Sequence, residues 1–227
     1  MGSSTSSSEH EHYLSKAAAY DTRIDAILPM SDLFFSSCLS FIPDGPVTLL
    51  ELGSGTGYAT SKILTVHPQA AVTCIDHSPE MIACALQKPE LQSVQILEQD
   101  IRDPWPDKQY DVIMTTLCFH HIPGDDRIVL LHRAYETLPS GGIFICGDIV
   151  RPEYAKAEEI YSARWIRTMK QAGLPPADIE QIIHSRKENY GEMETIERFI
   201  RKIHDIGFSE VLMPYRHEIS AVFVGIK

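Results

Sequence analysis

The sequence predicts an α/β fold in which a doubly wound, mostly parallel sheet ends in an antiparallel hairpin. From residue 47 to about residue 149, short apolar runs alternate with amphipathic helical stretches. This alternation implies right-handed crossovers and a parallel sheet covered on both faces. Only about two residues separate the apolar runs 210–216 and 219–226, so these must pair as a hairpin and the last strand runs antiparallel to the others.

The composition fits one domain with a large core. Of the 227 residues, 44% are hydrophobic and 22% are charged, which excludes extended disorder, collagen and coiled coil for the whole chain. Residues 1–12 are Ser-rich and polar, and we predict a disordered tail there and a single domain over residues 13–227.

The charge balance disfavours nucleic acid as a partner. Lys and Arg number 20 against 31 Asp and Glu, so the net charge of −11 repels polyphosphate. No apolar run approaches the ~18 residues that span a bilayer, and the first residues lack the basic and apolar blocks of a signal peptide. We therefore expect a cytoplasmic protein without a membrane partner.

Cysteines and histidines give no sign of a metal site. The five cysteines are odd in number and form no Cys-x-x-Cys pair, so neither a disulfide framework nor a zinc site is indicated. A site built from His120, His121, Asp125 and Asp126 lacks any motif spacing, and we predict no metal.

Two helices are predicted before the first strand, as a cap over residues 13–44. Apolar residues recur there at helical spacing, Leu28 and Pro29 separate the two helices, and residues 43–46 form a turn. Residues 47–52 then read as a buried strand, residues 53–57 as a glycine-rich turn, and residues 58–66 as a helix.

The alternation continues with strands at 71–76, 94–98, 110–116 and 142–149. After the strand at 71–76, Ser78 can cap a helix that has Pro79 at its first position. Another helix spans about 125–138 and ends at the turn 139–142. A last helix is expected at 192–206, before the hairpin.

Residues 151–190 are helical but too long for a plain crossover, with a break at residues 173–176. One apolar stripe recurs at spacings of three and four residues: Tyr154, Ala157, Tyr161, Trp165 and Met169. One hypothesis is that this insertion is a lid over an apolar acceptor. The alternative is that it packs on the sheet or on a second subunit of a homodimer.

The turn 53–57 and Asp76 together indicate a nucleoside site. Small residues at the carboxyl edge of a sheet let a ligand approach the backbone, and the helix that follows offers free amides. Asp76 ends the second strand near the spacing expected for a carboxylate that binds ribose hydroxyls. Tyr58 replaces the third glycine of the dinucleotide fingerprint, and no phosphate-binding P-loop follows, so pyrophosphate is disfavoured.

Five motifs in order resemble the class I S-adenosylmethionine (SAM) methyltransferases, whose fold is a Rossmann-like sheet with the C-terminal hairpin and strand order 3-2-1-4-5-7-6. The resemblance covers about residues 45–227. The motifs are the turn from Glu51 to Gly57, Asp76, the stretch from Glu98 to Ile101, the strand from Tyr110 with Phe119 to Ile122 after it, and the turn from Leu138 to Gly142.

The resemblance implies SAM as the cofactor and a role for each matching residue. Gly53, Ser54 and Gly55 would face the methionine part, Glu51 its amino group and Asp76 the ribose. His77 and Met81 would line the adenine, Asp100 would accept from its amino group, and Ile101 would pack on the ring. Thr116 and Leu117 would flank the sulfonium, and Tyr13, Tyr20 and Arg23 would close the pocket from the N-terminal helix.

The acceptor is expected to be a small molecule. His120 and His121 follow the fourth strand, where an imidazole can take a proton from an acceptor. They are the candidate catalytic residues, with packing as the alternative, and Cys118 is predicted to be a small buried thiol.

Other functions stay open. The stretch from Ile160 to Lys227 also resembles the carboxy-SAM synthases, although Lys202 and Thr116 stand where those enzymes have an Arg and an Asn. A SAM-binding protein without catalysis and a nicotinamide-linked oxidoreductase are further alternatives.

Overall fold

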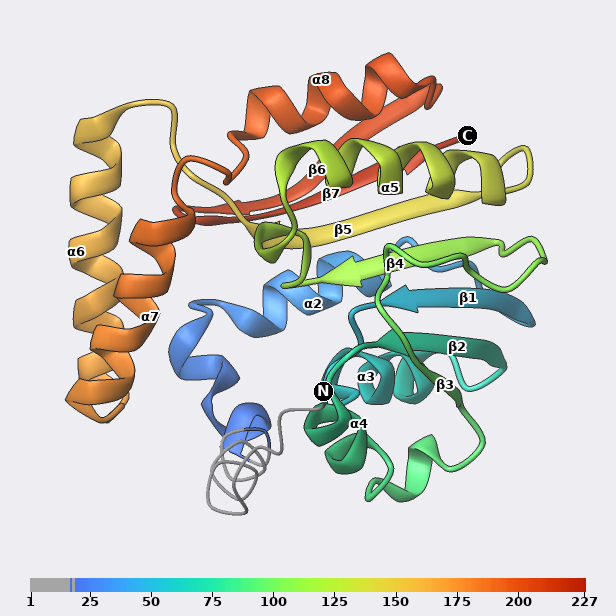
Figure 1. The fold of residues 1–227 in the computed structure, drawn as a ribbon, viewed down its shortest axis with the longest axis horizontal. Coiled ribbons are helices and arrows are strands. Elements are labelled where there is room, and N and C mark those ends of the chain that lie inside the picture. The colour runs from blue at the N-terminus through green and yellow to red at the C-terminus, as the bar shows by residue number, and fades with distance from the viewer. Residues whose placement is uncertain (1–16, 18) are drawn as a thin grey trace, which may run out of the picture.

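The computed structural model describes residue 17 and residues 19–227, in which helices cover both faces of a seven-stranded sheet (Figure 1). The strands are β1 (Val47–Leu52), β2 (Ala70–Asp76), β3 (Gln95–Glu98), β4 (Val112–Thr116), β5 (Ile143–Ile149), β6 (Glu210–His217) and β7 (Ser220–Ile226). The helices are α2 (Ser31–Leu39), α3 (Tyr58–Val66), α4 (Pro79–Ala85), α5 (Gly124–Thr137), α6 (Ala155–Gln171), α7 (Pro176–Asn189) and α8 (Ile196–Ile206), with short 3-10 turns at Pro89–Leu91 and Phe119–His121. Residues 19–27 are also helical.

The strand order confirms the predicted fold class. The sheet runs β3-β2-β1-β4-β5-β7-β6, and β7 is antiparallel to both of its neighbours. The chain winds from β1 outward to β3 and then returns to β4 on the other side of β1, so the crossovers diverge between β1 and β4. That divergence leaves a crevice at the carboxyl ends of the strands, where open α/β sheets bind ligands.

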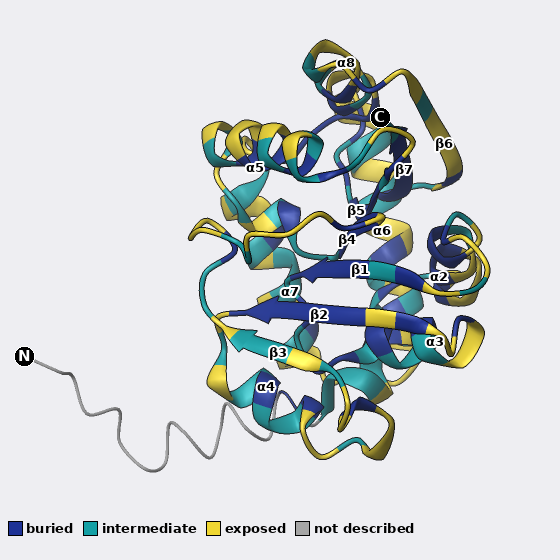
Figure 2. Cartoon of the chain, turned by 90° about the vertical axis from the view of Figure 1, so that its right-hand side faces the viewer, coloured by how far each residue is buried: buried dark blue, intermediate teal, exposed yellow. Residues whose placement is uncertain are grey.

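Alternating strand residues build a core on each face of the sheet. On one face, Leu49 and Met114 pack with α2 and α3, and on the other face Leu50 and Ile113 pack with α5 and α8. Figure 2 shows the central strands mostly buried and the outer sides of the helices exposed. Each buried Leu or Ile side chain contributes about 1.5–3 kcal/mol relative to exposure.

Side-chain caps set where the helices begin. Ser78 accepts the amide of Met81 at 3.3 Å and precedes Pro79, which confirms the predicted start of α4. The helix predicted over residues 192–206 starts later, because the Thr195 side chain accepts the amide of Arg198 at 3.4 Å. That prediction was therefore wrong by four residues at its start.

The insertion forms a separate two-helix layer across one end of the sheet. In Figure 1, α6 and α7 stand side by side at the end toward which the arrowheads of β1 and β4 point. Gly173, with φ +80°, makes the turn between the two helices. Trp165 and Met169 are buried among apolar residues of α7 and of the segment 26–27. Tyr154 is 76% exposed, which corrects the prediction that it belongs to the packed stripe.

Polar contacts attach the N-terminal helix to this layer. Arg23 Nη1 lies 2.6 Å from Asp178 Oδ2, and Trp165 Nε1 donates to the carbonyl oxygen of Ile27 at 2.5 Å. The residues at 19–27 therefore bridge the sheet and the helices α6 and α7. The predicted tail 1–12 and Tyr13 lie outside the described residues. No helix in the described part of the chain is long and apolar enough to cross a membrane.

Candidate functional site

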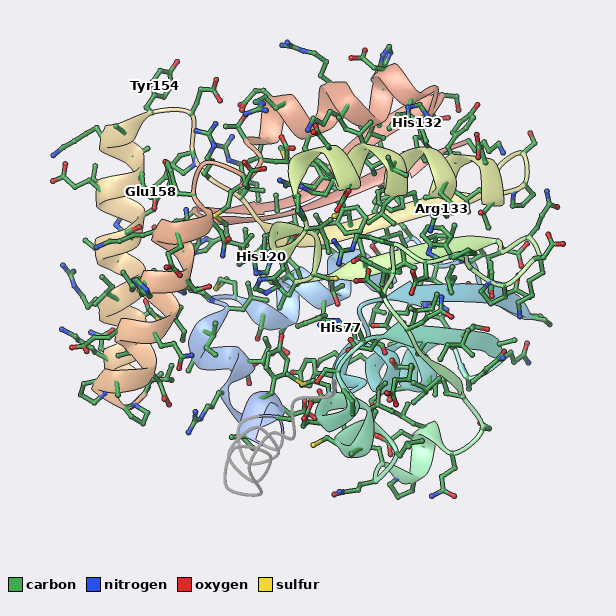
Figure 3. The ribbon with its side chains drawn as sticks, in the orientation of Figure 1. His77, His120, His132, Arg133, Tyr154 and Glu158 are labelled. Atoms are coloured by element: carbon green, nitrogen blue, oxygen red, sulfur yellow. The ribbon has the colours of Figure 1, made fainter. Side chains whose placement is uncertain are left out.

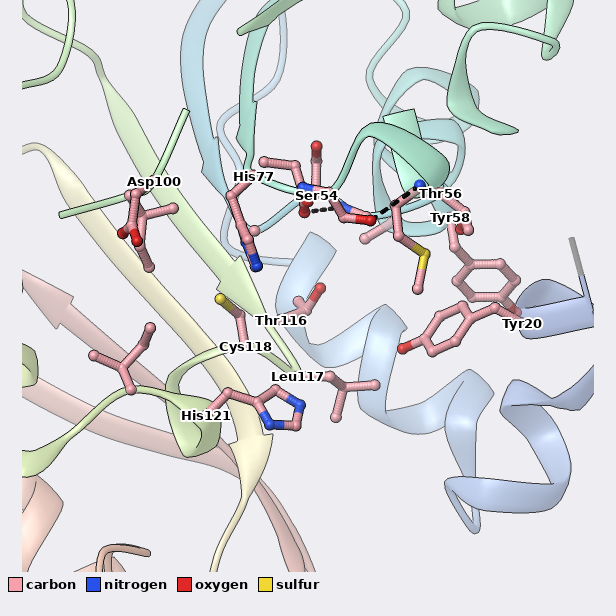
Figure 4. A pocket seen from close by; sticks show the side chains of 18 of the residues that line it. Tyr20, Ser54, Thr56, Tyr58, His77, Asp100, Thr116, Leu117, Cys118 and His121 are labelled. Carbon is pink, nitrogen blue, oxygen red and sulfur yellow. Dashed lines mark hydrogen bonds between the residues drawn. The ribbon is translucent and has the colours of Figure 1, made fainter. Parts of the chain in front are cut away.

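A cavity of about 560 Å³ opens at the carboxyl ends of β1, β2 and β4 (Figure 4). Its walls include Tyr20 and every residue that was predicted to contact a part of SAM except Glu51: Gly53, Ser54, Gly55, Asp76, His77, Met81, Asp100, Ile101, Thr116 and Leu117. Tyr20 and Asp100 lie at opposite ends of the cavity in Figure 4. We call this space the first cavity.

The glycine turn brings the backbone to the wall of the first cavity. Gly53 has φ +72°, and a Cβ added there would lie 2.8 Å from Cys118 Cβ and closer still to its sulfur. Gly55 also has a positive φ, +55°, but an added Cβ would meet nothing within 4 Å. Gly53 therefore fits only as glycine, and the turn at Gly55 presents bare backbone to a ligand.

Asp76 is a buried carboxylate that faces the turn. Its Oδ2 accepts the amide of Gly55 at 2.6 Å, and its Oδ1 accepts the amide of Ser78 at 2.9 Å. A carboxylate oxygen has two lone pairs, so each oxygen can accept one more hydrogen bond. The side chain can thus hold two ligand hydroxyls while it fixes the loop.

Glu51 lies beneath the glycine turn and does not line the first cavity. Its Oε2 accepts the hydroxyl of Thr60 at 2.5 Å, whereas its buried Oε1 has no hydrogen-bond partner among the described residues. Burial raises the pKa of Glu51 to about 7. The buried hydroxyl of Ser54 in the turn also lacks a described partner. Two unsatisfied groups therefore lie at the same end of β1, which fits a polar ligand group next to them.

Asp100 is paired with Arg102, a residue that was not predicted from the sequence to belong to the site. Its two oxygens accept from Arg102 Nε at 2.9 Å and Nη2 at 2.6 Å, and these bonds lower the pKa of Asp100 to about 2. Arg102 also reaches Asp126 at 3.2 Å and lines the first cavity. This end of the cavity therefore holds a fixed, ionised carboxylate.

The N-terminal helix closes the other end. Asp21 accepts the Thr56 hydroxyl at 2.5 Å and pairs with Lys88 at 2.5 Å, which holds the helix over the glycine turn. Burial raises the pKa of the neighbouring Tyr20, so its phenol stays protonated and can donate. Arg23 is used in the ion pair with Asp178 and lines neither cavity.

Some residues of the wall were not predicted to bind. They are Phe35, Thr56, Tyr58, Ala59, Ser78, Arg102, Cys118, Ile122 and Pro123. Thr56 and Ile122 belong to motifs that were recognised and Ser78 is the predicted helix cap, so their positions were available from the sequence. Phe35 comes from α2, which packs under the sheet, and nothing local in the sequence marks it.

A second cavity of about 310 Å³ lies between the first cavity and the insertion. Its lining is mostly apolar and comes chiefly from the N-terminal segment, α6 and α7: Ile24, Ile27, Leu28, Trp165, Gln181, Ile182, Ser185, Arg186 and Asn189. The end of β5, the loop after α7 and the turn after β4 add Ile149, Met193 and His120. Tyr20, Leu117 and His121 line both cavities. The two spaces therefore meet at these three side chains.

The two candidate bases differ in position. His121 lines both cavities, whereas His120 lines only the second, with the ring centroids 3.8 Å apart. Burial and the neighbouring His120 lower the pKa of His121 to about 4, so it is neutral at physiological pH.

Burial raises the pKa of the Cys118 thiol to about 12, as expected for a structural rather than a nucleophilic cysteine.

Comparison with known proteins gives the same family. A family model described as a methyltransferase domain matches residues 50–146. A malonyl-acyl-carrier-protein O-methyltransferase of Bacillus cytotoxicus is 30% identical over 162 residues, 67% of this chain and 56% of the relative. A carboxy-S-adenosyl-L-methionine synthase of Dichelobacter nodosus is 27% identical over 192 residues, 79% of this chain and 75% of the relative. The chain spans about half to two thirds of the length of the malonyl-acyl-carrier-protein relatives it matches.

Solved structures share the fold. An O-methyltransferase family protein from Burkholderia thailandensis superposes with a TM-score of 0.67 at 16% identity, covering 97% of this chain and 62% of that chain. The structure described as a DhpI-SAM-HEP complex has a TM-score of 0.62 at 21% identity and covers 99% of this chain and 100% of that one. The family model and the sequence relatives show that the chain belongs to the class I SAM-dependent methyltransferase family, and the solved structures show that it shares that family's fold.

Proposed function

We propose that this chain transfers the methyl group of SAM to a small molecule held in the second cavity. The observation that carries the proposal is the junction of two cavities at Tyr20, Leu117 and His121. One cavity has the residues expected for SAM, and the other is lined mainly by apolar side chains under a helical cap. A methyl donor in the first cavity would therefore lie next to an acceptor in the second.

The methionine part of SAM is proposed to lie along the glycine turn. Gly53, Ser54 and Gly55 leave room for it, and Glu51 supplies a buried carboxyl whose free oxygen suits an ammonium group. Asp76 would accept from the ribose hydroxyls with its remaining lone pairs. When bound, SAM supplies an activated methyl group on a sulfonium.

The adenine is proposed to lie toward Asp100. His77 and Met81 also line the first cavity, and Ile101 offers an apolar surface to a ring. The carboxylate of Asp100 is ionised and can accept from an exocyclic amine. At the other end, Thr116 and Leu117 from the end of β4 would flank the sulfonium, and Tyr20 would cover the methionine part.

The chain's own contribution to the rate is positioning and exclusion of water. Methyl transfer needs the acceptor atom in line with the methyl–sulfur bond, and holding that alignment lowers the barrier. Trp165 and Arg186 of the insertion line the second cavity, and so do the candidate bases His120 and His121. Cytoplasmic location and a homodimer stay predictions from the sequence.

Carboxy-SAM synthesis is less well supported. Lys202, at the position of the family's arginine, donates to Glu194 at 2.5 Å and lines neither cavity. Thr116, in place of the asparagine, does line the first cavity. The contact with Glu194 leaves this lysine poorly placed to hold an added carboxylate.

Calorimetry with SAM tests the proposal. Asp76→Ala should weaken SAM binding roughly tenfold to a hundredfold, because a charged hydrogen-bond acceptor worth about 1.5–3 kcal/mol is lost. Asp111→Ala is the matched control, since Asp111 accepts from Thr48 at the opposite end of the sheet. Equal affinity of the Asp76 variant and the wild type would contradict the site. Release of S-adenosylhomocysteine with a pool of acceptors is expected, and bound SAM without turnover would indicate a non-catalytic SAM-binding protein.

A further inference from the structure

A buried carboxylate lies behind one of the two histidines. Asp148 in β5 is 6% exposed, and its Oδ1 lies 2.6 Å from His120 Nδ1. Its Oδ2 accepts the backbone amide of His120 at 2.7 Å, and Oδ1 also accepts the amide of Ile149 at 2.8 Å. An ionised carboxylate only accepts hydrogen bonds, so the proton of the His120 ring is held on Nδ1.

This contact leaves a lone pair on Nε2 of His120. The His120 side chain, labelled in Figure 3, is 17% exposed and lines the second cavity, whereas Asp148 is not among the residues of that lining. Nε2 is therefore the ring nitrogen available to a molecule in the cavity. His121 has no carboxylate contact of this kind among the described residues, and its lowered pKa makes it a weak proton acceptor.

The rest of the second cavity suits an uncharged molecule. Most of its lining is aliphatic or aromatic, and its volume of about 310 Å³ is that of a small ligand site. The cation in its wall is already paired, because Arg186 Nε and Nη2 lie 2.8 and 2.7 Å from the two oxygens of Glu158. A bound anion would have to compete with Glu158 for Arg186.

We propose that His120 is the catalytic base for a hydroxyl group on a largely apolar, uncharged acceptor, and that Asp148 is the positioning residue that holds its ring. This inference rests on the proposed function. The acceptor oxygen forms a bond to the methyl carbon, and the methyl–sulfur bond breaks with its electron pair going to sulfur. The hydroxyl proton goes to Nε2 of His120, and Asp148 stabilises the imidazolium that results. A general base of this kind contributes about 100-fold or more to the rate.

Two phenols of different acidity test the proposal. With SAM in mildly alkaline buffer, 4-methylphenol keeps its proton and needs a base, whereas 4-nitrophenol is already ionised. His120→Gln and Asp148→Asn should slow methylation of 4-methylphenol about 100-fold and that of 4-nitrophenol only a few-fold. A purely structural role would slow both phenols equally, and this result would overturn the proposal. His132→Gln, on the exposed side of α5, is the control and should change neither rate.

A second measurement does not depend on turnover. In ¹⁵N-labelled protein, the His120 ring should carry its proton on Nδ1 in the wild type and lose this preference in Asp148→Asn, with recovery in Asp148→Glu. A proton on Nε2 in the wild type would overturn the assignment of the base.

The acceptor class and the proposed function fail in different ways. If SAM binds and neither phenol is methylated, or if benzoate is methylated in their place, the acceptor class is wrong while the proposed function stands. If SAM does not bind, the proposed function itself fails.

Discussion

Replacing Glu51 by Gln should stabilise the protein near neutral pH and leave its stability in acid unchanged. Glu51 is buried, with one oxygen lacking a partner in the described chain, and burial raises its pKa from 4.5 to about 7. Below pH 4.5 both folded and unfolded chains hold the proton. As the pH rises to 7, the unfolded chain loses it while the folded chain keeps it, so wild-type stability falls. At 1.36 kcal/mol for each pKa unit, the loss is about 3 kcal/mol.

Urea unfolding of the wild type and of Glu51→Gln without SAM, from pH 4.5 to above pH 7, measures the difference between their free energies of unfolding. His121 acts in the opposite direction, because its lowered pKa, about 4, gives stability that is present above pH 6.5 and lost as the pH falls toward 4. That contribution is the same in both proteins and cancels in the difference. Glu98→Gln, an exposed carboxyl on β3, is the control. A constant difference between wild type and Glu51→Gln across this range would refute the reasoning.

Three further results are expected. In the wild type below pH 7, SAM binding should release close to one proton, because Glu51 must ionise to hold an ammonium group. Calorimetry in buffers of different ionisation enthalpy should show this release. The substitution Glu51→Gln should abolish it. Gly53→Ala should cost about 1–3 kcal/mol more in urea unfolding than Gly141→Ala, since both glycines have positive φ but only Gly53 abuts Cys118. Arg186→Met should cost up to about 3 kcal/mol, because the partly buried carboxylate of Glu158 loses its cation and keeps only the Ser162 hydroxyl, and adding Glu158→Leu should restore most of that stability.

The strands and the sheet could be predicted from the sequence because their signals are local. Residues 47–52 and 58–66 have the predicted bounds, since a continuous apolar run and a glycine turn mark each end. The hairpin follows from the short turn between two apolar runs. The start of α8 was missed because Thr195 competes with earlier residues as a cap, and only the folded chain shows which one accepts the amide.

The first cavity was largely predictable for a topological reason. Residues that follow parallel strands converge at one edge of the sheet, so motifs at Gly53, Asp76 and Thr116 meet there. The side chain of Glu51 points from β1 toward Thr60 of α3, so it is buried and does not line the cavity. The role proposed for it stays a prediction.

Contacts between distant elements could not be predicted. His120 and Asp148 are 28 residues apart and meet because β4 and β5 are neighbours with their carboxyl ends aligned. The second cavity needs the N-terminal helix, α6 and α7 to pack together, and no periodicity within one helix specifies that arrangement. For the same reason, the prediction of a packed apolar stripe was right for Trp165, which is buried, and wrong for Tyr154, which is exposed.

A crystal structure with S-adenosylhomocysteine would test the central proposal most directly. The nucleoside is expected in the first cavity, with its ribose hydroxyls on Asp76, its adenine toward Asp100 and its sulfur near Leu117, facing the second cavity. Nucleoside bound away from Asp76, or sulfur pointing away from the second cavity, would contradict the proposed transfer between the two sites.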